Sequence, residues 1–382
     1  MLVLHIITSL KIGGAESSLR NLLKHFKSDK NNKTDHCVIY FHDGPNSLEI
    51  KNLGIPTYHI QGIFSAYDPI ALYRLLKLIY EKIQPDIIHS ALWSSNIISR
   101  VIGWLLKIPV ICDLHSDCSH HGKLRNFLER IALNLPCRFV AVSNSVKDSF
   151  ENYLARRSLI SDLSGEASAK TEAWVDNLHK ISVINNGLDI SSLAKNSISK
   201  TNLDNFVVGS VGRLVDIKNY DVLLKAFALL DKDINAKLCL IGDGPKRDDL
   251  EDLAEKLNIK DSIKFFGEQE DSCKFYPSFD CFVLPSKSEG MSISLLEALS
   301  FGLPIVTTHY KNSHDVIVSG VNGFLVTPGN EKELCDALLK LYKDKNLRKS
   351  MCKSNLELSK SKFDIKKMAS EYKHIYESCQ SS

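Results

Sequence analysis

Short apolar runs alternate with amphipathic stretches along most of this chain, which indicates a parallel α/β fold. In the first half, apolar runs predict strands at Leu2–Thr8, His36–Phe41, Thr57–Ile60, Ile87–His89, Val110–Leu114, Phe139–Val142 and Ile181–Ile184. Between them, apolar residues recur with helical spacing at Ala15–Phe26, Ile70–Ile83, Ser95–Leu106 and Lys123–Leu133. A chain in which one strand after another returns through a helix is typical of a doubly wound sheet.

The same alternation starts again near residue 207. Strands are predicted at Val207–Val211, Lys237–Ile241, Ile263–Phe266, Cys281–Leu284, Ile305–Thr307 and Gly323–Val326. Helices are predicted at Asn219–Leu230, Arg247–Leu257, Ser292–Phe301 and Lys332–Tyr342. We therefore expect two doubly wound α/β domains in tandem, an architecture that supports many chemistries and does not name one.

Stretches without apolar periodicity set the expected domain boundaries. Arg156–Lys170 is rich in Ser, Ala and Gly, so 155–180 is predicted to be a mobile loop or insertion. Polar Ser191–Asn205 is predicted to link the domains, and amphipathic Phe363–Tyr376 to form a last helix. The expected organisation is a first domain at 1–190, a linker at 191–205, a second domain at 206–360 and a C-terminal helix at 361–382.

Composition narrows the function classes. A length of 382 residues favours two domains, and 44% hydrophobic with 24% charged residues is ordinary for a soluble globular protein. The net charge of +3 argues against a nucleic-acid binder, which would carry a concentrated basic stripe. The ten cysteines form no C-x-x-C pair, which favours free thiols in a reducing compartment.

Membrane insertion and export are not expected. Met1–Ser9 lacks the basic start and the cleavage site of a signal peptide, and it fits a buried strand better. The apolar stretch from Ile97 to Val110 is too short and too interrupted by polar residues to span a bilayer. We therefore expect a cytoplasmic protein.

Two cations follow the first strand of the second series. Arg213 and Lys218 come after Val207–Val211, at the carboxyl end of a strand, where open α/β sheets bind ligands. A planar bidentate guanidinium and a compact ammonium together suit a diphosphate. For an isolated pair, two solvated surface cations are the simpler interpretation.

Two later loops add to this candidate site. Gly242 and Gly244 end the next strand, where they form either a tight turn or a place for a ligand to approach the backbone. In LPSKSEGMSISLLEALSFGLP (284–304), a strand ends, a loop offers Glu289, and a helix begins near Ser292 as N-cap. The first turn of that helix can bind an anion, and Glu289 and Glu297 can accept from sugar and ribose hydroxyls. The alternative is a solvated loop acid followed by an ordinary helix-face acid.

The first half of the chain contains fewer candidate functional residues. Gly13-Gly14-Ala15-Glu16 opens a helix but is not a full dinucleotide fingerprint, so a nicotinamide site is poorly supported. His115 follows the strand Val110–Leu114, with Asp113 and Asp117 able to orient its ring, although a strand-terminal His is as often a satisfied surface residue. No neighbouring Ser or Cys elbow suggests a nucleophile.

No convincing metal motif is present. Asp231-Lys232-Asp233 is the nearest match to D-x-D, and a polar turn explains it. We therefore expect no metal and no cofactor.

The order of these pieces resembles the family-4 retaining glycosyltransferases, whose fold is GT-B. Glu289–Glu297 is similar to the family's E-x7-E motif and runs on into EALSFGLPIV. Other pieces that match are VGRL at 211–214 with Lys218, IGDGP at 241–245, FFG at 265–267, NNGLD at 185–189 and GGAE at 13–16. The resemblance covers nearly the whole chain. It implies two Rossmann-like domains facing across a cleft, with a C-terminal helix crossing back onto the first domain, and it implies transfer from a nucleotide-sugar without a metal.

The resemblance also implies roles for individual residues. Arg213 and Lys218 hold the donor diphosphate and stabilise the leaving nucleotide. Glu289 contacts the sugar hydroxyls, beside the backbone amides of Gly290, Met291 and Ser292, while Glu297 binds ribose. Gly14 lets the backbone pass close to the phosphates and acceptor, and His115 lies beside the transferred sugar. The remaining donor-binding glycines are Gly242 and Gly244. One departure is the loop HYKNSHDVI after Ile305–Thr307, which has Asp315 where the family commonly has a glycine pair and then Glu.

The resulting hypothesis is a transferase that moves a hexose or N-acetylhexosamine, most often from a UDP-sugar in this group. The acceptor is expected to be a polysaccharide or lipid-linked glycan met from the cytoplasmic side. Lys123–Leu133, with Lys123, Arg125, Arg130 and the following Arg138, is a candidate peripheral membrane contact, and a solvated basic face is the alternative. Two rival hypotheses are a sugar-nucleotide epimerase on the same fold and a non-catalytic partner subunit. The first lacks acid/base candidates beyond Glu289 and His115, and the second is disfavoured because the whole set of candidate residues is present.

Overall fold

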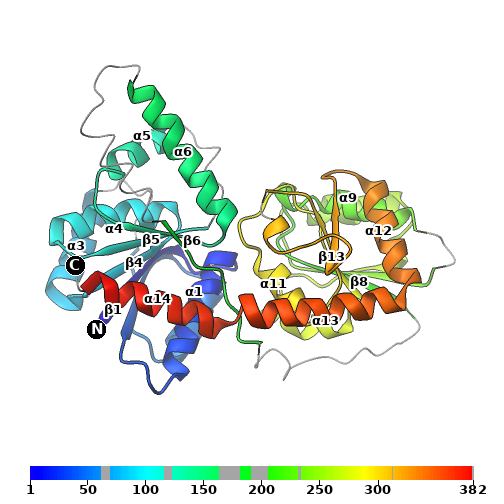
Figure 1. Cartoon of the computed structure of the whole chain (residues 1–382), viewed down its shortest axis with the longest axis horizontal. Helices are drawn as coiled ribbons and strands as arrows, with labels where there is room; N and C mark the ends of the chain where they lie inside the picture. Colours follow the sequence, from blue (N-terminus) through cyan, green and yellow to red (C-terminus); the bar gives the residue numbers. More distant parts are fainter. Residues whose placement is uncertain are drawn as a thin grey trace. The chain divides into compact units, whose positions relative to one another are not determined.

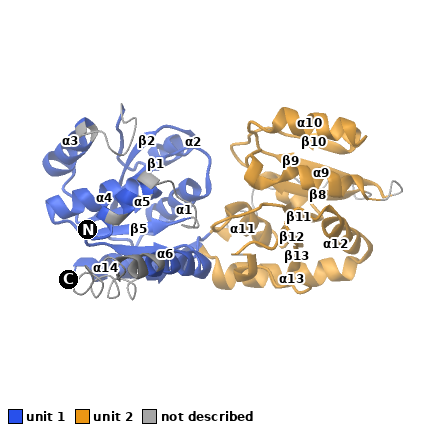
Figure 2. Ribbon diagram, turned by 90° about the horizontal axis from the view of Figure 1, so that it is seen from above, with its two compact units in different colours: residues 1–187, 365–382 blue, residues 188–364 orange. Residues whose placement is uncertain are grey.

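The computed structural model describes residues 1–61, 69–115, 123–162, 181–190, 205–230, 234–311 and 313–380. The chain forms two compact units (Figure 2). Unit 1 comprises Met1–Gly187 together with Ile365–Ser382, and unit 2 comprises Leu188–Asp364. These divisions fall close to the boundaries expected at residues 190 and 360. The expected linker at 191–205 lies, apart from its last residue, outside the described residues.

Unit 1 contains a parallel sheet whose seven described strands run in the order β3-β2-β1-β4-β5-β6-β7. These strands are β1 (Leu2–Ser9), β2 (Asp35–His42), β3 (Thr57–His59), β4 (Ile87–Ala91), β5 (Val110–Leu114), β6 (Arg138–Ala141) and β7 (Ile181–Val183). Its helices are α1 (Gly14–Ser28), α2 (Pro45–Asn52), α3 (Pro69–Leu78) with a π-helical turn at Ile79–Ile83, α4 (Trp93–Leu106), α5 (Lys123–Ala132), α6 (Asn144–Asp162) and α14 (Ile365–Gln380). The strand order is Rossmann-like, with its reversal between β1 and β4.

Unit 2 repeats this design with six described parallel strands in the order β10-β9-β8-β11-β12-β13. They are β8 (Phe206–Val211), β9 (Ala236–Ile241), β10 (Ile263–Phe265), β11 (Cys281–Leu284), β12 (Ile305–Thr308) and β13 (Gly323–Val326). Its helices are η3 (Asp216–Lys218), α9 (Tyr220–Ala228), α10 (Arg247–Lys256), η4 (Lys260–Ser262), η5 (Cys273–Ser278), α11 (Ile293–Ser300), η6 (Ser313–Asp315), α12 (Glu331–Lys343) and α13 (Lys345–Lys362). Here the order reverses between β8 and β11.

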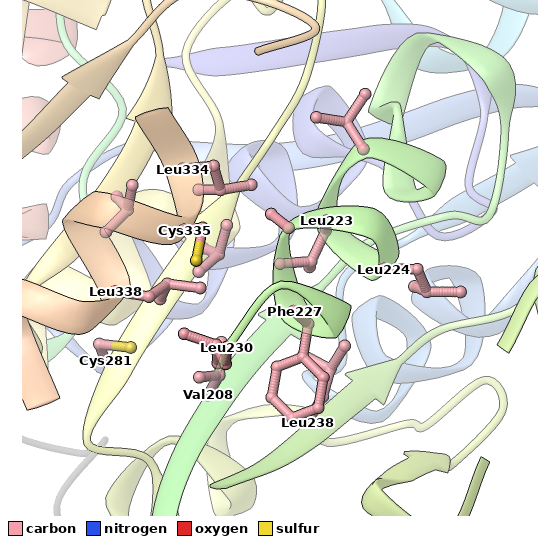
Figure 3. Close-up of a cluster of buried hydrophobic side chains, with 14 of the residues drawn as sticks. Val208, Leu223, Leu224, Phe227, Leu230, Leu238, Cys281, Leu334, Cys335 and Leu338 are labelled. Atoms are coloured by element: carbon pink, nitrogen blue, oxygen red, sulfur yellow. The ribbon is translucent and has the colours of Figure 1, made fainter. Parts of the chain in front are cut away.

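The core of unit 2 explains why its strands are continuously apolar. Val208 on β8 and Leu238 on β9 pack with Phe227 of α9 and Leu338 of α12, and all four are at most 5% exposed (Figure 3). A parallel sheet covered by helices on both faces has no solvated side, so its strands read as apolar runs and not as alternation.

The chain returns from unit 2 to unit 1 between α13 and α14 (Figure 1). Helix α14 buries an apolar stripe, including Met368, Tyr372, Ile375 and Tyr376, against the unit 1 core. These positions recur at the three- and four-residue spacing of one helix face. Phe363–Tyr376 was predicted as a helix from this spacing; the helix begins two residues later and continues to Gln380.

Three helical regions differ from the sequence prediction. Residues 155–162 were expected to lie in a mobile loop, but they continue helix α6 to Asp162, and 163–180 lie outside the described residues. Helices α2 and α13 were not predicted, and neither was the first part of α6, at 144–154. In the Ser/Lys/Glu-rich α13 only three residues are buried, so the helix has little apolar periodicity to detect. Among the described residues, no helix is long and apolar enough to cross a bilayer.

Candidate functional site

The candidate donor residues of unit 2 gather where its strand order reverses. Strands β8 and β11 are parallel neighbours, so their carboxyl ends meet at the same edge of the sheet. The loop after β8 carries Arg213 and Lys218, and the loop after β11 carries Glu289. This edge is where open α/β sheets bind ligands.

The sharpest contact at this edge is an ion pair. The Lys218 Nζ lies 2.5 Å from Glu289 Oε1, and the hydroxyl of Ser286 donates to the same oxygen at 2.6 Å. The Lys218 and Glu289 side chains are only 15% and 14% exposed, so this pair is better shielded from water than a surface ion pair. The structure thus brings together two residues that lie 71 positions apart in the sequence.

Arg213 is at the same edge but is exposed, and no ion pair between described residues engages it. It follows Gly212, whose φ is +158°. A Cβ at Gly212 would lie 2.9 Å from the Tyr220 hydroxyl and 3.5 Å from Lys218 Cε. Gly212 therefore leaves room for the buried Tyr220 hydroxyl, whereas a Cβ at this position would make only an ordinary contact with the Lys218 side chain.

Gly242 and Gly244 have a packing reason at this edge. A Cβ at Gly242 would lie 2.1 Å from the carbonyl oxygen of Gly212, and one at Gly244 would lie 2.4 Å from that of Leu214. The loops after β8 and β9 thus approach so closely that side chains are excluded from both positions. Backbone packing requires glycine at both positions without any ligand.

Helix α11 begins as predicted, with Ser292 at its N-cap. The Ser292 side chain does not cap the helix by a hydrogen bond, and its Oγ lies 3.1 Å from that of Ser294. Gly290 is half-buried and Met291 is buried just before this cap. The first turn of α11 thus presents its positive dipole end on the loop that carries Glu289.

Glu297 lies on α11 and is 9% exposed. The hydroxyl of Tyr276, from the 3₁₀ helix η5, donates to Glu297 Oε2 at 2.7 Å. The Tyr276 ring is fully buried and stacks on Phe301 with ring centroids 5.3 Å apart. Sequence reasoning missed Tyr276, because it lies in the mixed segment 271–280 between two predicted strands, and only its buried carboxylate partner distinguishes it.

In unit 1, the predicted glycine loop follows β1. Gly13 is the N-cap of α1, and exposed Gly14 is its first residue. A Cβ at Gly13 would lie 2.3 Å from Glu16 Oε2, and the Ser9 hydroxyl donates to Glu16 Oε1 at 2.7 Å. The glycine loop therefore accommodates the buried Glu16 carboxylate.

His115 follows β5 and is part of a buried polar network. Its Nε2 is 3.8 Å from Asp113 Oδ2, and that oxygen accepts hydrogen bonds from His89 Nε2 at 2.8 Å and from the Tyr372 hydroxyl at 2.9 Å. Tyr376 contacts the other nitrogen of His89 at 2.7 Å. Asp113 was predicted to orient His115; the second candidate, Asp117, lies outside the described residues.

Burial controls the charge of the histidines around this network. Desolvation is the main cause that lowers the pKa of His115, and it outweighs the attraction of Asp113 and Glu16. Desolvation also lowers the pKa of His36 to about 4 and that of His5 well below its usual value. His115 is therefore a neutral imidazole near pH 7, able to donate or accept a hydrogen bond without adding positive charge.

A pocket of about 60 Å³ borders His115 on the side of α4 and α5. Behind it, the fully buried Arg100 lies 2.6 Å from Glu129 Oε1, and the Trp93 indole donates to Glu129 Oε2 at 2.6 Å. The Arg125 guanidinium lies 4.6 Å from the Trp93 ring centroid. Sequence reasoning missed Arg100 and Glu129, because a charged residue on a helix normally predicts an exposed face.

The predicted basic face of α5 is organised differently from the expectation. Arg125 lies over Trp93, and Arg138 donates to Ser378 on α14. Phe127 and Ile131, one helical turn apart, are instead 59% and 53% exposed.

The side chains of Lys123 and Arg130 lie outside the described residues, as does the segment Asp231-Lys232-Asp233. In the loop after β12, Asp315 is half-buried and its carbonyl accepts from Lys362 Nζ at 2.7 Å.

Comparison with known proteins identifies the family. Residues 12–161 match the model of Glycosyltransferase Family 4, and residues 194–357 match that of Glycosyl transferases group 1. An uncharacterized glycosyltransferase of Haemophilus influenzae is 31% identical over 211 residues, or 54% of this chain. The matched region spans 58% of the length of that relative.

Two further comparisons extend over more of the chain. A UDP-Gal:alpha-D-GlcNAc-diphosphoundecaprenol alpha-1,3-galactosyltransferase of Escherichia coli is 26% identical over 321 residues, covering 80% of this chain and 78% of the relative. The crystal structure of Anabaena HepE in complex with UDP aligns over 99% of this chain and 100% of HepE, with a TM-score of 0.80 and 20% identity. That level of identity establishes the fold alone, which is GT-B. The chain therefore belongs to the family-4, group 1 glycosyltransferases, a family of sugar-transferring enzymes.

Proposed function

We propose that this protein transfers a hexose or N-acetylhexosamine from a UDP-sugar to a polysaccharide or lipid-linked glycan, with retention of the anomeric configuration. The observation that carries the proposal is the shielded Lys218–Glu289 pair beside the start of α11. At this sheet edge, a cation and a helix N-terminus suit the diphosphate of such a donor, and a carboxylate suits its sugar hydroxyls.

In the proposed reaction, Arg213 and Lys218 bind the diphosphate and stabilise the charge that it gains as it leaves. Glu289 gives up part of its contact with Lys218 and accepts hydrogen bonds from the sugar hydroxyls. Glu297 accepts hydrogen bonds from the ribose hydroxyls. The bond between the anomeric carbon and the phosphate oxygen breaks, and the acceptor oxygen bonds to that carbon on the same face. The acceptor proton passes to the departing phosphate, so no separate general base is needed.

His115 fits this reaction as a neutral group. The transition state carries positive charge on the sugar ring, and an imidazolium beside it would repel that charge. Because burial lowers the pKa of His115, the neutral ring can contact the sugar without this penalty. The role of His115 in the proposal is thus to bind the transferred sugar, not to exchange a proton with it.

The proposal includes metal independence. Positive charge that a Mg²⁺ ion supplies in other transferases is assigned here to Arg213, Lys218 and the N-terminus of α11. Activity of metal-stripped protein should therefore persist in excess EDTA. Complete loss of activity that Mg²⁺ or Mn²⁺ restores would contradict this part of the proposal.

The donor and acceptor classes draw on the relatives. The Escherichia coli relative is named for UDP-Gal and a diphosphoundecaprenol-linked sugar, and HepE binds UDP. A lipid-linked acceptor requires access to a membrane surface, for which the exposed Phe127 and Ile131 on α5 offer an apolar contact. We propose a cytoplasmic protein that binds peripherally at the inner face of the membrane through this helix.

The test is a transfer assay with purified protein. Thermal-shift screening against nucleoside diphosphates and their sugars first identifies the donor, because a ligand at ~100 Kd stabilises by ~2.7 kcal/mol. Transfer to a lipid-diphosphate-linked sugar is then measured, and proton NMR of the product gives its anomeric configuration. A β-linked product from an α-linked donor would overturn the retaining mechanism, and stabilisation by no nucleotide would overturn the donor site.

A further inference from the structure

The buried network around Asp113 joins the C-terminal helix to the candidate sugar-binding histidine. On β1, β4 and β5, the residues Val3, Ile87 and Ile111 form an apolar layer under α1 and α14. Two positions further along each strand, and therefore on the same face, stand His5, His89 and Asp113. Polar groups thus lie in the core closer to the carboxyl edge that carries His115: His5 and His89 are register partners, and Asp113 lies one pair further toward that edge.

Helix α14 supplies hydrogen-bond donors to these buried polar groups. Tyr372 and Tyr376 are four residues apart and thus on one helix face, and they are 1% and 0% exposed. The Tyr372 hydroxyl donates to Asp113 Oδ2 at 2.9 Å, whereas Tyr376 reaches His89 Nδ1 at 2.7 Å. Because the Asp113 carboxylate only accepts, His89 must present its proton on Nε2, and in the neutral ring its Nδ1 accepts from Tyr376.

These bonds fix the carboxylate that faces His115. Both His89 and Tyr372 donate to Oδ2, while Oδ1 of Asp113 and Nε2 of His115 are buried and have no hydrogen-bond partner in the described residues. The two unpartnered atoms belong to residues whose Nε2 and Oδ2 are 3.8 Å apart. The Asp113 oxygen that the two donors hold is thus the one that lies beside the His115 ring, so the position of His115 depends on Asp113 staying in place.

We propose that Tyr372 of the C-terminal helix is a positioning residue for His115 and acts through Asp113. The inference rests on the proposed function, in which His115 binds the transferred sugar. Helix α14 thereby has a second role besides covering the core: the Tyr372 hydroxyl sets the orientation of the carboxylate beside the reacting centre. The direct effect of Tyr372 is on Asp113, and it touches no substrate.

The titratable groups that face His115 determine whether its pKa should rise or fall in each variant. They are Asp113 on β5, Glu16 on α1 and His89 on β4, while His5 on β1 and the two tyrosines of α14 complete the surroundings. Removing the Tyr372 hydroxyl leaves Asp113 with one donor fewer, so its charge attracts a proton on His115 more strongly. The pKa of His115 should therefore rise in Tyr372→Phe and fall in Asp113→Asn.

The matched control is Tyr376→Phe, which removes the same hydroxyl from the same buried helix face but from a bond to His89. With kinetics at saturating donor and acceptor, Tyr372→Phe should lower kcat on the order of 10-fold with little change in the donor KM, because a small misplacement of a contact group slows the reacting step. Tyr376→Phe should lower kcat about threefold at most, and both should lower the melting temperature by similar amounts. A Tyr372→Phe variant that loses stability but keeps the wild-type kcat would overturn the proposal.

A second readout needs no activity. Histidine-labelled protein, with the His115 signal assigned from its loss in His115→Asn, is titrated by NMR in wild type, Tyr372→Phe and Asp113→Asn. The expected order of His115 pKa values is Tyr372→Phe above wild type above Asp113→Asn. The same pKa in wild type and in Tyr372→Phe would overturn the positioning role, whereas an inactive wild type with the expected order would overturn only the proposed function.

Discussion

The two sheet edges of this protein hold their candidate residues by different means. In unit 2, Lys218 ends the 3₁₀ helix η3 and Glu289 lies on the loop after β11; their side chains are 15% and 14% exposed and neutralise each other directly. In unit 1, His115 ends a strand beside Asp113, whose partners are buried side chains from β4 and α14. The candidate donor residues of unit 2 therefore depend on a direct contact between two opposite charges. In unit 1, burial favours the neutral form of His115, and the carboxylate beside it is held by buried donors from two other elements.

The largest expected effect concerns the most buried ion pair, which lies behind the unit 1 edge. Glu129→Gln leaves the fully buried Arg100 without its charge partner, and it should lower the free energy of unfolding by about 3–5 kcal/mol. Urea unfolding measures this change. The control is Lys246→Ala in the exposed Lys246–Asp249 pair of unit 2, which should leave the urea midpoint unchanged. Equal midpoints for Glu129→Gln and wild type would remove the contrast between the two units.

The next effect should appear in turnover and not in stability. Lys218→Ala removes a cation that stabilises the leaving diphosphate, and it should lower kcat by about 10²–10³-fold, or ~2.7–4 kcal/mol. Steady-state kinetics with the identified donor measures it, and circular dichroism checks the fold. Lys287→Ala, an exposed lysine of the same edge, is the matched control and should keep wild-type kcat. Near wild-type turnover in Lys218→Ala would refute the donor site.

A third variant tests whether unit 2 also contains a buried positioning bond. Tyr276→Phe frees Glu297 Oε2 from its hydroxyl donor, and it should raise the donor KM about tenfold, a typical ~1.4 kcal/mol for a bond to a charged group. Turnover at saturating donor should change little, because ribose is remote from the reacting bond. Tyr342→Phe removes a hydroxyl from a partly exposed tyrosine of the same unit and serves as control. An unchanged KM would show that Glu297 does not depend on Tyr276.

The last expected effect is a dependence of stability on pH that arises in unit 1. Burial lowers the pKa of His36 to about 4, whereas an unfolded histidine has a pKa near 6.5. Between those pH values, His36 is protonated in the unfolded chain but not in the native chain. The free energy of unfolding therefore falls as the pH decreases from about 6.5 to about 4. The slope is at most about 1.4 kcal/mol per pH unit for one such histidine.

Urea unfolding at several pH values checks this slope. His36→Gln should flatten it, while His374→Gln, at an exposed position on α14, should not. If the slope between pH 6.5 and 4 is the same in His36→Gln as in wild type, buried His36 is not its source.

Local patterns of apolar and polar residues predicted much of the fold. Parallel strands with both faces covered leave long apolar runs, and helices with one solvated face leave periodic ones, so strands such as Val110–Leu114 were predicted at their observed bounds. The polar α13 and the whole of α6 showed neither pattern, which is why the prediction missed both helices. Gly242 and Gly244 were recognised as special positions, but the neighbouring loop backbone that requires them is visible only in three dimensions.

The sequence by itself determined where strands end, and thereby which residues could reach a carboxyl edge, because that depends on patterns within a few residues. The tertiary structure decided which of these residues share a bond. Tyr372 and Asp113 are separated by 259 positions, and they meet only because α14 docks on the face of the sheet that carries Asp113. A tyrosine on an amphipathic helix is predicted to be an ordinary core residue, since its apolar ring fits the helical spacing. The spacing carries no information about its hydroxyl. Only the packed structure shows which buried partner that hydroxyl finds.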